Sequence, residues 1–502
     1  MKVARMKTKI FLAIVSIAAF ASAAYAQGGM AAQTPSSTKG AVIKGKAPVN
    51  KKLLRVKLPK PEEGTLKNGL KVVVLEGNHR LPIFSMEMVL MSGGLSDPAD
   101  MHGLAATTAT LLREGTAKHK SRELSEALDT IGAQLGANSG VASPTTNISA
   151  SGLTENFDQI LDLFAEVIRT PTFPAEEVER YKSRSLAQQP LLRSQPQFLA
   201  AERLNQAIYG THPASLVITP ATTLKKITAA DLTKFHAENY VANNATLFIA
   251  GDVTLKEIMP KLERTFGDWK TGNVSAPVLP QVPAQGDTRI HLINRPGSVQ
   301  TVFQIGSLGL ERTDPDYVAG VLMNRILGVG PGSRLFLNIR EDKGYTYSVG
   351  SSFSSGKYRG LFTAQSPVRT EVTEGTIREF MNEFKRIRDE KVSAAELENA
   401  KNAIIGGFAL QLENPNSLIN LQQTQRLYNL PANYWDTYPQ KVEAITAEDI
   451  QRVAMKYIDL NHLQIVAVGD AAKTREALAK FGNVQEYDSN GNAVKTASTG
   501  GQ

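Results

Sequence analysis

The sequence predicts an α+β protein of two homologous halves, each a mixed or antiparallel sheet layered with helices. The first observation behind this is an internal repeat. Ile227–Asp231 recurs as Ile445–Asp449, an offset of 445 − 227 = 218 residues, and both segments carry the capping pattern of a helix start. Two more pairs follow in the same order: the buried-strand pattern 247–252 with 465–470, and Phe266-Gly267 with Phe481-Gly482. Three matches at nearly constant spacing favour a tandem duplication.

The second observation is that strand and helix patterns do not alternate strictly. Apolar alternation predicts strands at 70–75, 83–90 and 141–151, and apolar residues at helical spacing predict helices at 121–135 and 157–168. In the second half, Asp314-Pro315 and the capping box Ser393–Glu396 predict two helix starts. Hairpins mixed with helices in this way are typical of an α+β sheet covered by helices.

Composition sets the expected domain boundaries. Residues 274–286 hold Pro277, Pro280 and Pro283 and lack a hydrophobic period, which predicts an extended linker. The halves are then expected at 62–273 and 287–485. Residues 486–502 are predicted to be a disordered tail.

The N-terminus predicts export. Four basic residues precede an apolar run from Ile10 to Ala21, and Ala24-Tyr25-Ala26 follows, so residues 1–26 read as a signal peptide cut after Ala26. We therefore expect a periplasmic or secreted protein. No later stretch approaches the roughly 20 apolar residues of a membrane helix, so no transmembrane helix is expected in the mature chain.

Charge gives no support for nucleic-acid binding. The net charge of +8 comes from residues 1–60, which hold twelve Lys and Arg and no acid, so the remainder carries 8 − 12 = −4. Residues 27–61 are predicted to be a flexible basic leader, which either touches anionic lipid or acidic protein or is simply solvated. The absence of cysteine excludes disulfides and thiolate metal ligands.

A frame of short motifs in the first half resembles the pitrilysin/insulinase class of peptidases, and the resemblance extends over roughly residues 62–485. The frame consists of Ser92–Pro98, Gly103-Leu104-Ala105 and Gly115-Thr116. In that class an inverted zinc motif, His-x-x-Glu-His, stands between the last two. Here the motif positions hold Ala106, Ala109 and Thr110, and a methyl group cannot bind Zn²⁺.

The resemblance places the class's third ligand, a glutamate, within Arg180–Gln189, which contains no carboxylate. Nor do the seven histidines supply a local site, because no two of them lie three to five residues apart. His102 and His212 are interpreted as turn or surface histidines. We expect no metal in this chain.

A second resemblance to the same family lies in the second half, where residues 330–349 closely resemble a family segment. In the family, an arginine and a tyrosine at the spacing of Arg340 and Tyr347 face the zinc from the opposite half. A guanidinium and a phenol can stabilise the oxyanion of a scissile carbonyl, but they cannot activate water. The alternative is an arginine at a helix C-terminus and a tyrosine packed along a strand. Tyr345 and Tyr358 are weaker candidates for substrate contact.

Three functions stay open. The first is the zinc-free subunit of a heterodimeric metallopeptidase, in which a homologous partner carries the Zn²⁺ and this chain supplies Arg340, Tyr347 and half of a clam-shell chamber for unfolded peptides. The second is a non-enzymatic structural or peptide-binding subunit. The third, a free-standing metallopeptidase with unusual ligands, is disfavoured by the missing side chains.

Overall fold

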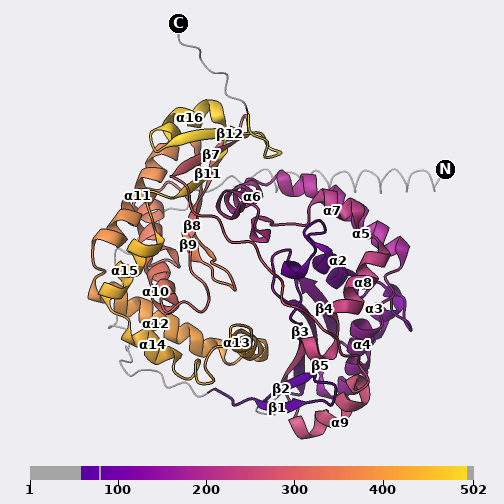
Figure 1. The fold of residues 1–502 in the computed structure, drawn as a ribbon. Helices are drawn as coiled ribbons and strands as arrows, with labels where there is room; N and C mark the ends of the chain where they lie inside the picture. Colours follow the sequence, from indigo (N-terminus) through magenta and orange to yellow (C-terminus); the bar gives the residue numbers. More distant parts are fainter. Residues whose placement is uncertain (1–57, 78–80, 495–502) are drawn as a thin grey trace, which may run out of the picture. The chain divides into compact units, whose positions relative to one another are not determined.

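A computed structural model describes residues 58–77 and 81–494 of the chain (Figure 1). The first half contains a six-stranded sheet in the order β1-β2-β6-β3-β5-β4. The strands β2 and β6 pair in parallel, and the other neighbours are antiparallel. The bounds are β1 (Glu62–Thr65), β2 (Lys71–Glu76), β3 (Ile83–Leu90), β4 (Gln134–Ser139), β5 (Thr146–Leu153) and β6 (Ala245–Gly251).

The second half repeats this topology with the order β12-β7-β11-β8-β10-β9. Five of the six positions, counted from the edge strands β4 and β9, match one to one. In these positions β7, β11, β8, β10 and β9 take the places of β2, β6, β3, β5 and β4. Only the outermost strand differs, because β1 is antiparallel to its neighbour whereas β12 is parallel. The bounds are β7 (Arg289–Asn294), β8 (Gln300–Leu308), β9 (Gly350–Phe353), β10 (Leu361–Arg369), β11 (Gln464–Gly469) and β12 (Asn483–Tyr487).

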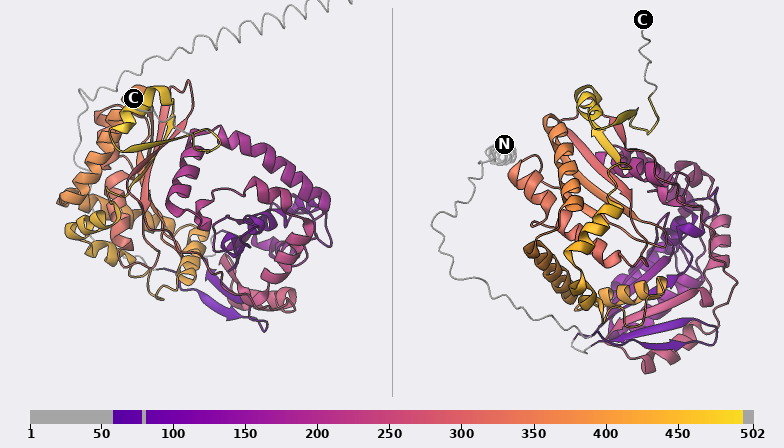
Figure 2. Two further views of the ribbon diagram at one scale, coloured as in Figure 1. Left: turned by 45° about the horizontal axis from the view of Figure 1, so that its top comes forward. Right: turned by 60° about the vertical axis from the view of Figure 1, so that its left-hand side comes forward.

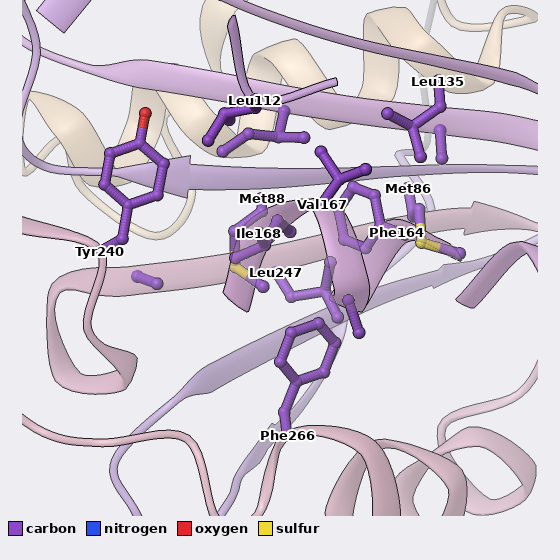
Figure 3. Packing of buried hydrophobic residues seen from close by; sticks show 14 of the residues in the cluster. Met86, Met88, Leu112, Leu135, Phe164, Val167, Ile168, Tyr240, Leu247 and Phe266 are labelled. Carbon is purple, nitrogen blue, oxygen red and sulfur yellow. The ribbon is translucent and has the colours of Figure 1, made fainter. Parts of the chain in front are cut away.

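One face of the first sheet carries the main core of that half (Figure 3). Alternate residues of β3, such as Met86 and Met88, meet Phe164 and Ile168, which lie at helical spacing on α4. The helices of this half are α2 (Leu104–Leu111), α3 (Ser121–Thr130), α4 (Phe157–Arg169), α5 (Ala175–Arg193), α6 (Pro196–Tyr209), α7 (Ala221–Lys226), α8 (Ala229–Asn239) and α9 (Leu255–Phe266).

The second sheet has an equivalent core, in which Phe303 and Phe362 of the sheet pack with Phe380 and Phe384 of α11. The helices here are α10 (Tyr317–Gly328), α11 (Thr373–Asp389), α12 (Ala394–Gln411), α13 (Pro415–Leu427), α14 (Tyr438–Ala444), α15 (Ala447–Tyr457) and α16 (Ala471–Ala479), together with the short π-helix η5 (Phe336–Asp342).

The repeated capping motifs form the N-terminal cap of an equivalent helix in each half. Thr228 caps α8 by accepting the N–H of Asp231, and Thr446 caps α15 by accepting the N–H of Asp449. Each aspartate in turn accepts the N–H of its own threonine, which completes the capping box. The predicted α+β fold and its duplication are therefore confirmed.

Each half has one helix that packs on the sheet of the other half. The helix α6 packs against β8 and β11 of the second sheet (Figure 2). Its Leu204 and Ile208 belong to one hydrophobic cluster with Val302 and Val466 of those strands. Reciprocally, α13 packs against β3 and β6 of the first sheet, where its Ile419 forms a second hydrophobic cluster with five sheet residues, among them Phe248. The second face of each sheet is thus partly covered by the opposite half.

The structure corrects three of the expected element boundaries. The helix expected at 121–135 ends at Thr130, because Gly132 adopts a left-handed backbone (φ 61°) and Leu135 enters β4 as a buried strand residue. The strand expected at 141–151 begins at Thr146, after a turn. The helix expected at Asp314-Pro315 begins at Tyr317, since Asp314 instead accepts the N–H of Asp316 and the hydroxyl of Tyr457.

Several expected segments lie partly or wholly outside the described residues. The signal peptide and almost all of the basic leader fall in residues 1–57. Between α9 and β7 no helix or strand occurs, and residues 274–286 lie in that interval. At the C-terminal end, β12 continues to Tyr487 and residues 488–494 turn back onto it, and the rest of the expected tail lies outside the described residues. No helix among the described residues is long and apolar enough to cross a membrane.

Candidate functional site

The three positions of the zinc motif lie on α2. The half-buried Ala106 and the exposed Thr110 are one turn apart, and Thr110 donates its hydroxyl hydrogen to the carbonyl oxygen of Ala106 at 2.8 Å. Ala109, at the position of the general base, is 1% exposed. The side chain of Thr110 is therefore occupied within its own helix, and its two companions have no polar atom to offer.

A buried carboxyl group holds the start of α2. Asp97 accepts the N–H of Gly103 at 2.6 Å and that of Ala105 at 2.8 Å, which satisfies donors at the helix N-terminus. Burial raises the pKa of Asp97 to about 7, and these backbone hydrogen bonds oppose the rise. Gly103 has a φ of 99°, and a Cβ at this position would overlap the side chain of Thr219, so glycine is required here.

The segment expected to hold the third zinc ligand lies on α5. Its last residue, Gln189, donates an amide hydrogen to the carbonyl oxygen of Thr219 at 3.0 Å, next to the start of α2. The side chain of Gln189 is therefore engaged with the backbone at Thr219. Across the described residues, no group of three or more His, Asp or Glu side chains could hold a metal ion. The residues present on α2 and α5 therefore do not fit a zinc ion.

The Gly115-Thr116 part of the frame is structural. The hydroxyl of Thr116 donates to the buried carboxylate of Glu166 on α4, and His119 Nδ1 lies 2.9 Å from the same oxygen. These contacts tie the end of the motif region to α4, which belongs to the core of the first half. The motif region keeps its supports although its ligands are absent.

Arg340 and Tyr347, the pair that the family resemblance singled out, lie next to each other in the structure. The guanidinium carbon of Arg340 lies 4.7 Å from the centre of the Tyr347 ring and 4.5 Å from that of Phe336. Its ionic contact is with Glu341, at 3.4 Å. Tyr347 is 83% exposed and precedes β9, so it is not packed along a strand. The pair presents a cation and a phenol to solvent, stacked on one another.

Neighbouring side chains fix the π-helix that carries Arg340. Asn338 donates to the carboxylates of Glu379 at 3.0 Å and Glu383 at 2.9 Å on α11. Arg334, whose side chain is 6% exposed, binds Glu396 of α12 through two nitrogens at 2.7 and 3.2 Å. Sequence reasoning gave neither Arg334 nor Asp97 a role. For Asp97 a signal existed, because it belongs to the retained frame Ser92–Pro98.

The two weaker candidates are held by other contacts. Tyr345 packs against the core of the second half, in space that Gly375 leaves free. Tyr358 donates to the carbonyl oxygen of Ala142 at 3.3 Å, and its ring lies 4.8 Å from that of His212 at a tilt of 58°. His212 also accepts the N–H of Ala214 and caps a short 3₁₀ turn. These contacts give Tyr358 and His212 structural roles.

The comparisons with known proteins agree with the two-part architecture. Residues 72–221 match Insulinase (Peptidase family M16), and residues 226–404 match the Peptidase M16 inactive domain. Among curated relatives, the uncharacterized zinc protease YmxG of Bacillus subtilis is 24% identical over 78% of this chain and 94% of its own length. The non-peptidase homolog YmxG of Helicobacter pylori is 22% identical over 80% and 93%.

Solved structures show the same fold. The peptidase M16 inactive domain from Pseudomonas fluorescens has a TM-score of 0.76 and 29% identity, over 82% of this chain and 98% of that one. A protease from Helicobacter pylori has a TM-score of 0.76 and 20% identity, over 82% and 100%. This chain belongs to peptidase family M16, as a member with no metal-binding side chain at positions 106, 109 and 110.

Proposed function

We propose that this chain is the zinc-free subunit of a heterodimeric metallopeptidase that works outside the cytoplasm. A homologous partner carries the Zn²⁺ and the residues that activate water. This chain contributes Arg340, Tyr347 and part of the surface that binds an unfolded peptide. The proposal joins a specific loss, the three motif positions on α2, with a specific retention in the second half.

The observation that carries the proposal is the stacked pair itself. The guanidinium carbon of Arg340 lies 4.7 Å from the centre of the Tyr347 ring, and the tyrosine is 83% exposed. Among the described residues this ring forms no aromatic pair and contacts the guanidinium of Arg340 instead. An exposed aromatic ring held over a guanidinium has little value for stability, since such contacts contribute on the order of 1 kcal/mol at a surface. A role toward a ligand or partner explains the arrangement better.

The chemistry available to this pair is electrostatic. Hydrolysis of a peptide develops negative charge on the carbonyl oxygen, and donors aimed at that oxygen lower the barrier. Arg340 supplies N–H donors on a permanent cation, and Tyr347 supplies a hydroxyl. Stacking on Phe336 and Tyr347 limits the rotamers of Arg340, so less entropy is lost when it binds the substrate.

The test is complementation in a verified complex. The chain is mixed with the zinc-bearing family member that co-purifies with it from the native host, and turnover of an unfolded peptide is measured. Tyr347→Phe, which keeps the ring, and Arg340→Ala are each expected to lower kcat by about 10² or more, as for the loss of one oxyanion donor. Arg184→Ala, at an exposed position of α5, serves as the matched control.

Unchanged turnover with both variants, in a complex of normal stoichiometry, would rule out the contribution in trans. The alternative would then be favoured, namely a structural or peptide-binding subunit without a part in the chemistry. The name of the Helicobacter pylori relative, a non-peptidase homolog, supports that alternative. Stable association with the partner without any change in its rate is the result that the alternative expects.

The proposed location rests on the N-terminal sequence. The basic start, the apolar run and Ala24-Tyr25-Ala26 support export and cleavage after Ala26. N-terminal sequencing of the protein from a periplasmic fraction is expected to begin at Gln27. A protein that starts at Met1 in the cytoplasmic fraction would contradict this part of the proposal.

A further inference from the structure

The second face of the first sheet has two chemically different parts. Toward β2 and β6 it is apolar, and Ile419 of α13 covers Val73, Val89 and Phe248 there. Toward β5 and the edge strand β4 it is polar and lies beside the N-terminal end of α13. Because side chains alternate along a strand, Ser85 and Glu87 of β3 share this face with Val89, whereas Met86 and Met88 point into the core.

The strand register sets the polar residues side by side. Ser85 pairs with Ser151, and Glu87 pairs with Ser149. On β4, Gln134 lies opposite Ser151, and Gly136 opposite Ser149. Together with Asn416 of α13, these residues line a cavity of about 370 Å³. This volume is within the range of sites that bind small ligands or single side chains.

Charge in this cavity has one sign. Glu87 is the single ionisable residue among those that line it, and among the described residues Glu87 forms no ion pair. Burial raises the pKa of its carboxyl group, and the nearby side chain of Gln423 only partly offsets the rise. A half-buried carboxylate without an ion-pair partner in the described part of the chain gains most from a cationic ligand that also brings N–H donors.

Space beside the carboxylate is also kept free. A Cβ added at Gly136 would meet nothing closer than the hydroxyl of Ser149, at 4.0 Å, and the backbone of Gly136 has no positive φ. The glycine is therefore not demanded by the fold of β4. Gly136 therefore adds no side chain to the part of the cavity that the edge strand β4 lines.

We infer that this cavity, which Glu87 lines, is a subsite for the lysine or arginine side chain of a bound peptide. The inference rests on the proposed function in taking a peptide as the ligand. The ammonium or guanidinium group pairs with the Glu87 carboxylate, and the hydroxyls of Ser85, Ser149 and Ser151 accept its remaining hydrogen bonds. The subsite would give the assembly a preference for basic substrates that comes from this chain rather than from its partner.

Peptide binding to the full chain alone tests the inference. Two fluorescein-labelled Ala/Ser-rich peptides, identical except for one central lysine or norleucine, are titrated by fluorescence anisotropy, and an arginine version is run beside them. The lysine and arginine peptides are expected to bind about tenfold more tightly than the norleucine peptide, as one charge-assisted contact implies. Glu87→Gln should abolish this preference without changing the norleucine Kd.

Two further variants separate a local contact from general charge. Glu238→Gln removes the same charge from an exposed position of α8 and should keep the tenfold preference. Gly136→Val narrows the cavity with Glu87 intact and should weaken the basic peptides selectively. Equal affinity for the three peptides, undetectable binding, or a preference that survives Glu87→Gln would overturn the inference.

The outcome does not depend on catalysis. No partner, zinc or hydrolysis enters the binding measurement, so a preference for basic peptides can be found even if mixing with a zinc-bearing subunit restores no activity. Conversely, complementation through Arg340 and Tyr347 can succeed while Glu87→Gln has no effect on peptide choice. The two failures are therefore distinguishable.

Discussion

Two arginines of the same segment have opposite environments. Arg334 is buried and forms a bidentate ion pair with Glu396, whereas Arg340 is a third exposed and is stacked between two rings. From sequence alone both belong to one motif of a family segment. Burial separates them, because a buried guanidinium must be paired whereas a half-exposed one can keep its donors for a ligand.

The ion pair of Arg334 predicts a loss of stability in acid. Burial alone raises the pKa of Glu396, but hydrogen bonds from Arg334 and Ser393 outweigh it and lower the pKa to about 2. The folded state therefore binds this proton more weakly than the unfolded state. The contribution is complete above about pH 4.5 and is lost as the pH falls toward about 2.

Urea unfolding measures this contribution. Because the Glu396 side chain is 31% exposed, screening reduces its effect to about 1–2 kcal/mol of unfolding free energy. Glu396→Gln, which keeps an acceptor for the capping box, should lower stability at neutral pH by this amount and flatten the acid dependence. Glu238→Gln is the exposed control. A variant as acid-sensitive as the parent chain would contradict the assignment.

At the residue scale, the sequence predicted those properties of the candidate site that depend only on which amino acid stands at a position. The side chains of Ala106 and Ala109 cannot bind a metal in any fold, and the resemblance to a family segment singled out Arg340 and Tyr347 as a pair. Burial was not predictable, since it depends on contacts distant in sequence. Glu87 reads as an ordinary polar residue of a strand until β4, β5 and α13 are placed around it.

At the scale of elements, the exchange of α6 and α13 is the feature that sequence patterns did not reveal. Neither helix was predicted from the sequence, and apolar residues within a helix do not say which sheet the helix covers. The capping boxes of α8 and α15 were predicted because they are local, whereas the end of α3 was misplaced because Leu135 fits a helical period as well as a strand. Tertiary context decides such cases.

The packing of α13 predicts a specific destabilisation. Ile419 is 1% exposed, and its side chain fills the cluster between α13 and the first sheet. Ile419→Ala should cost about 2–4 kcal/mol of unfolding free energy, because it removes buried methyl groups and leaves a cavity. Leu410→Ala, at a side chain 73% exposed on α12, should cost less than about 0.5 kcal/mol. Equal losses in chemical denaturation would mean that α13 does not dock as described.

At the scale of the whole molecule, duplication explains why one chain carries two similar sheets with different chemistry. The same order of five strands is built twice. The motif region lies between β3 and β4 in the first half, and the Arg340-Tyr347 segment lies between β8 and β9, the corresponding strands of the second half. Each copy needs the other, because the second face of each sheet is covered by a helix from the opposite half. Folding and function can therefore diverge between copies without separating them.

This reciprocal packing predicts that the halves stay together when the chain is cut between them. Val278 is 98% exposed and lies between α9 and β7, so a protease site inserted there should be cleaved without unfolding. The two fragments are expected to co-elute in size-exclusion chromatography, since the clusters around Leu204 and Ile419 are apolar and buried. The cut chain with Leu204→Ala and Ile419→Ala should separate at lower urea than the cut parent. Fragments that elute apart without denaturant would show that the linker, rather than the exchanged helices, holds the halves together.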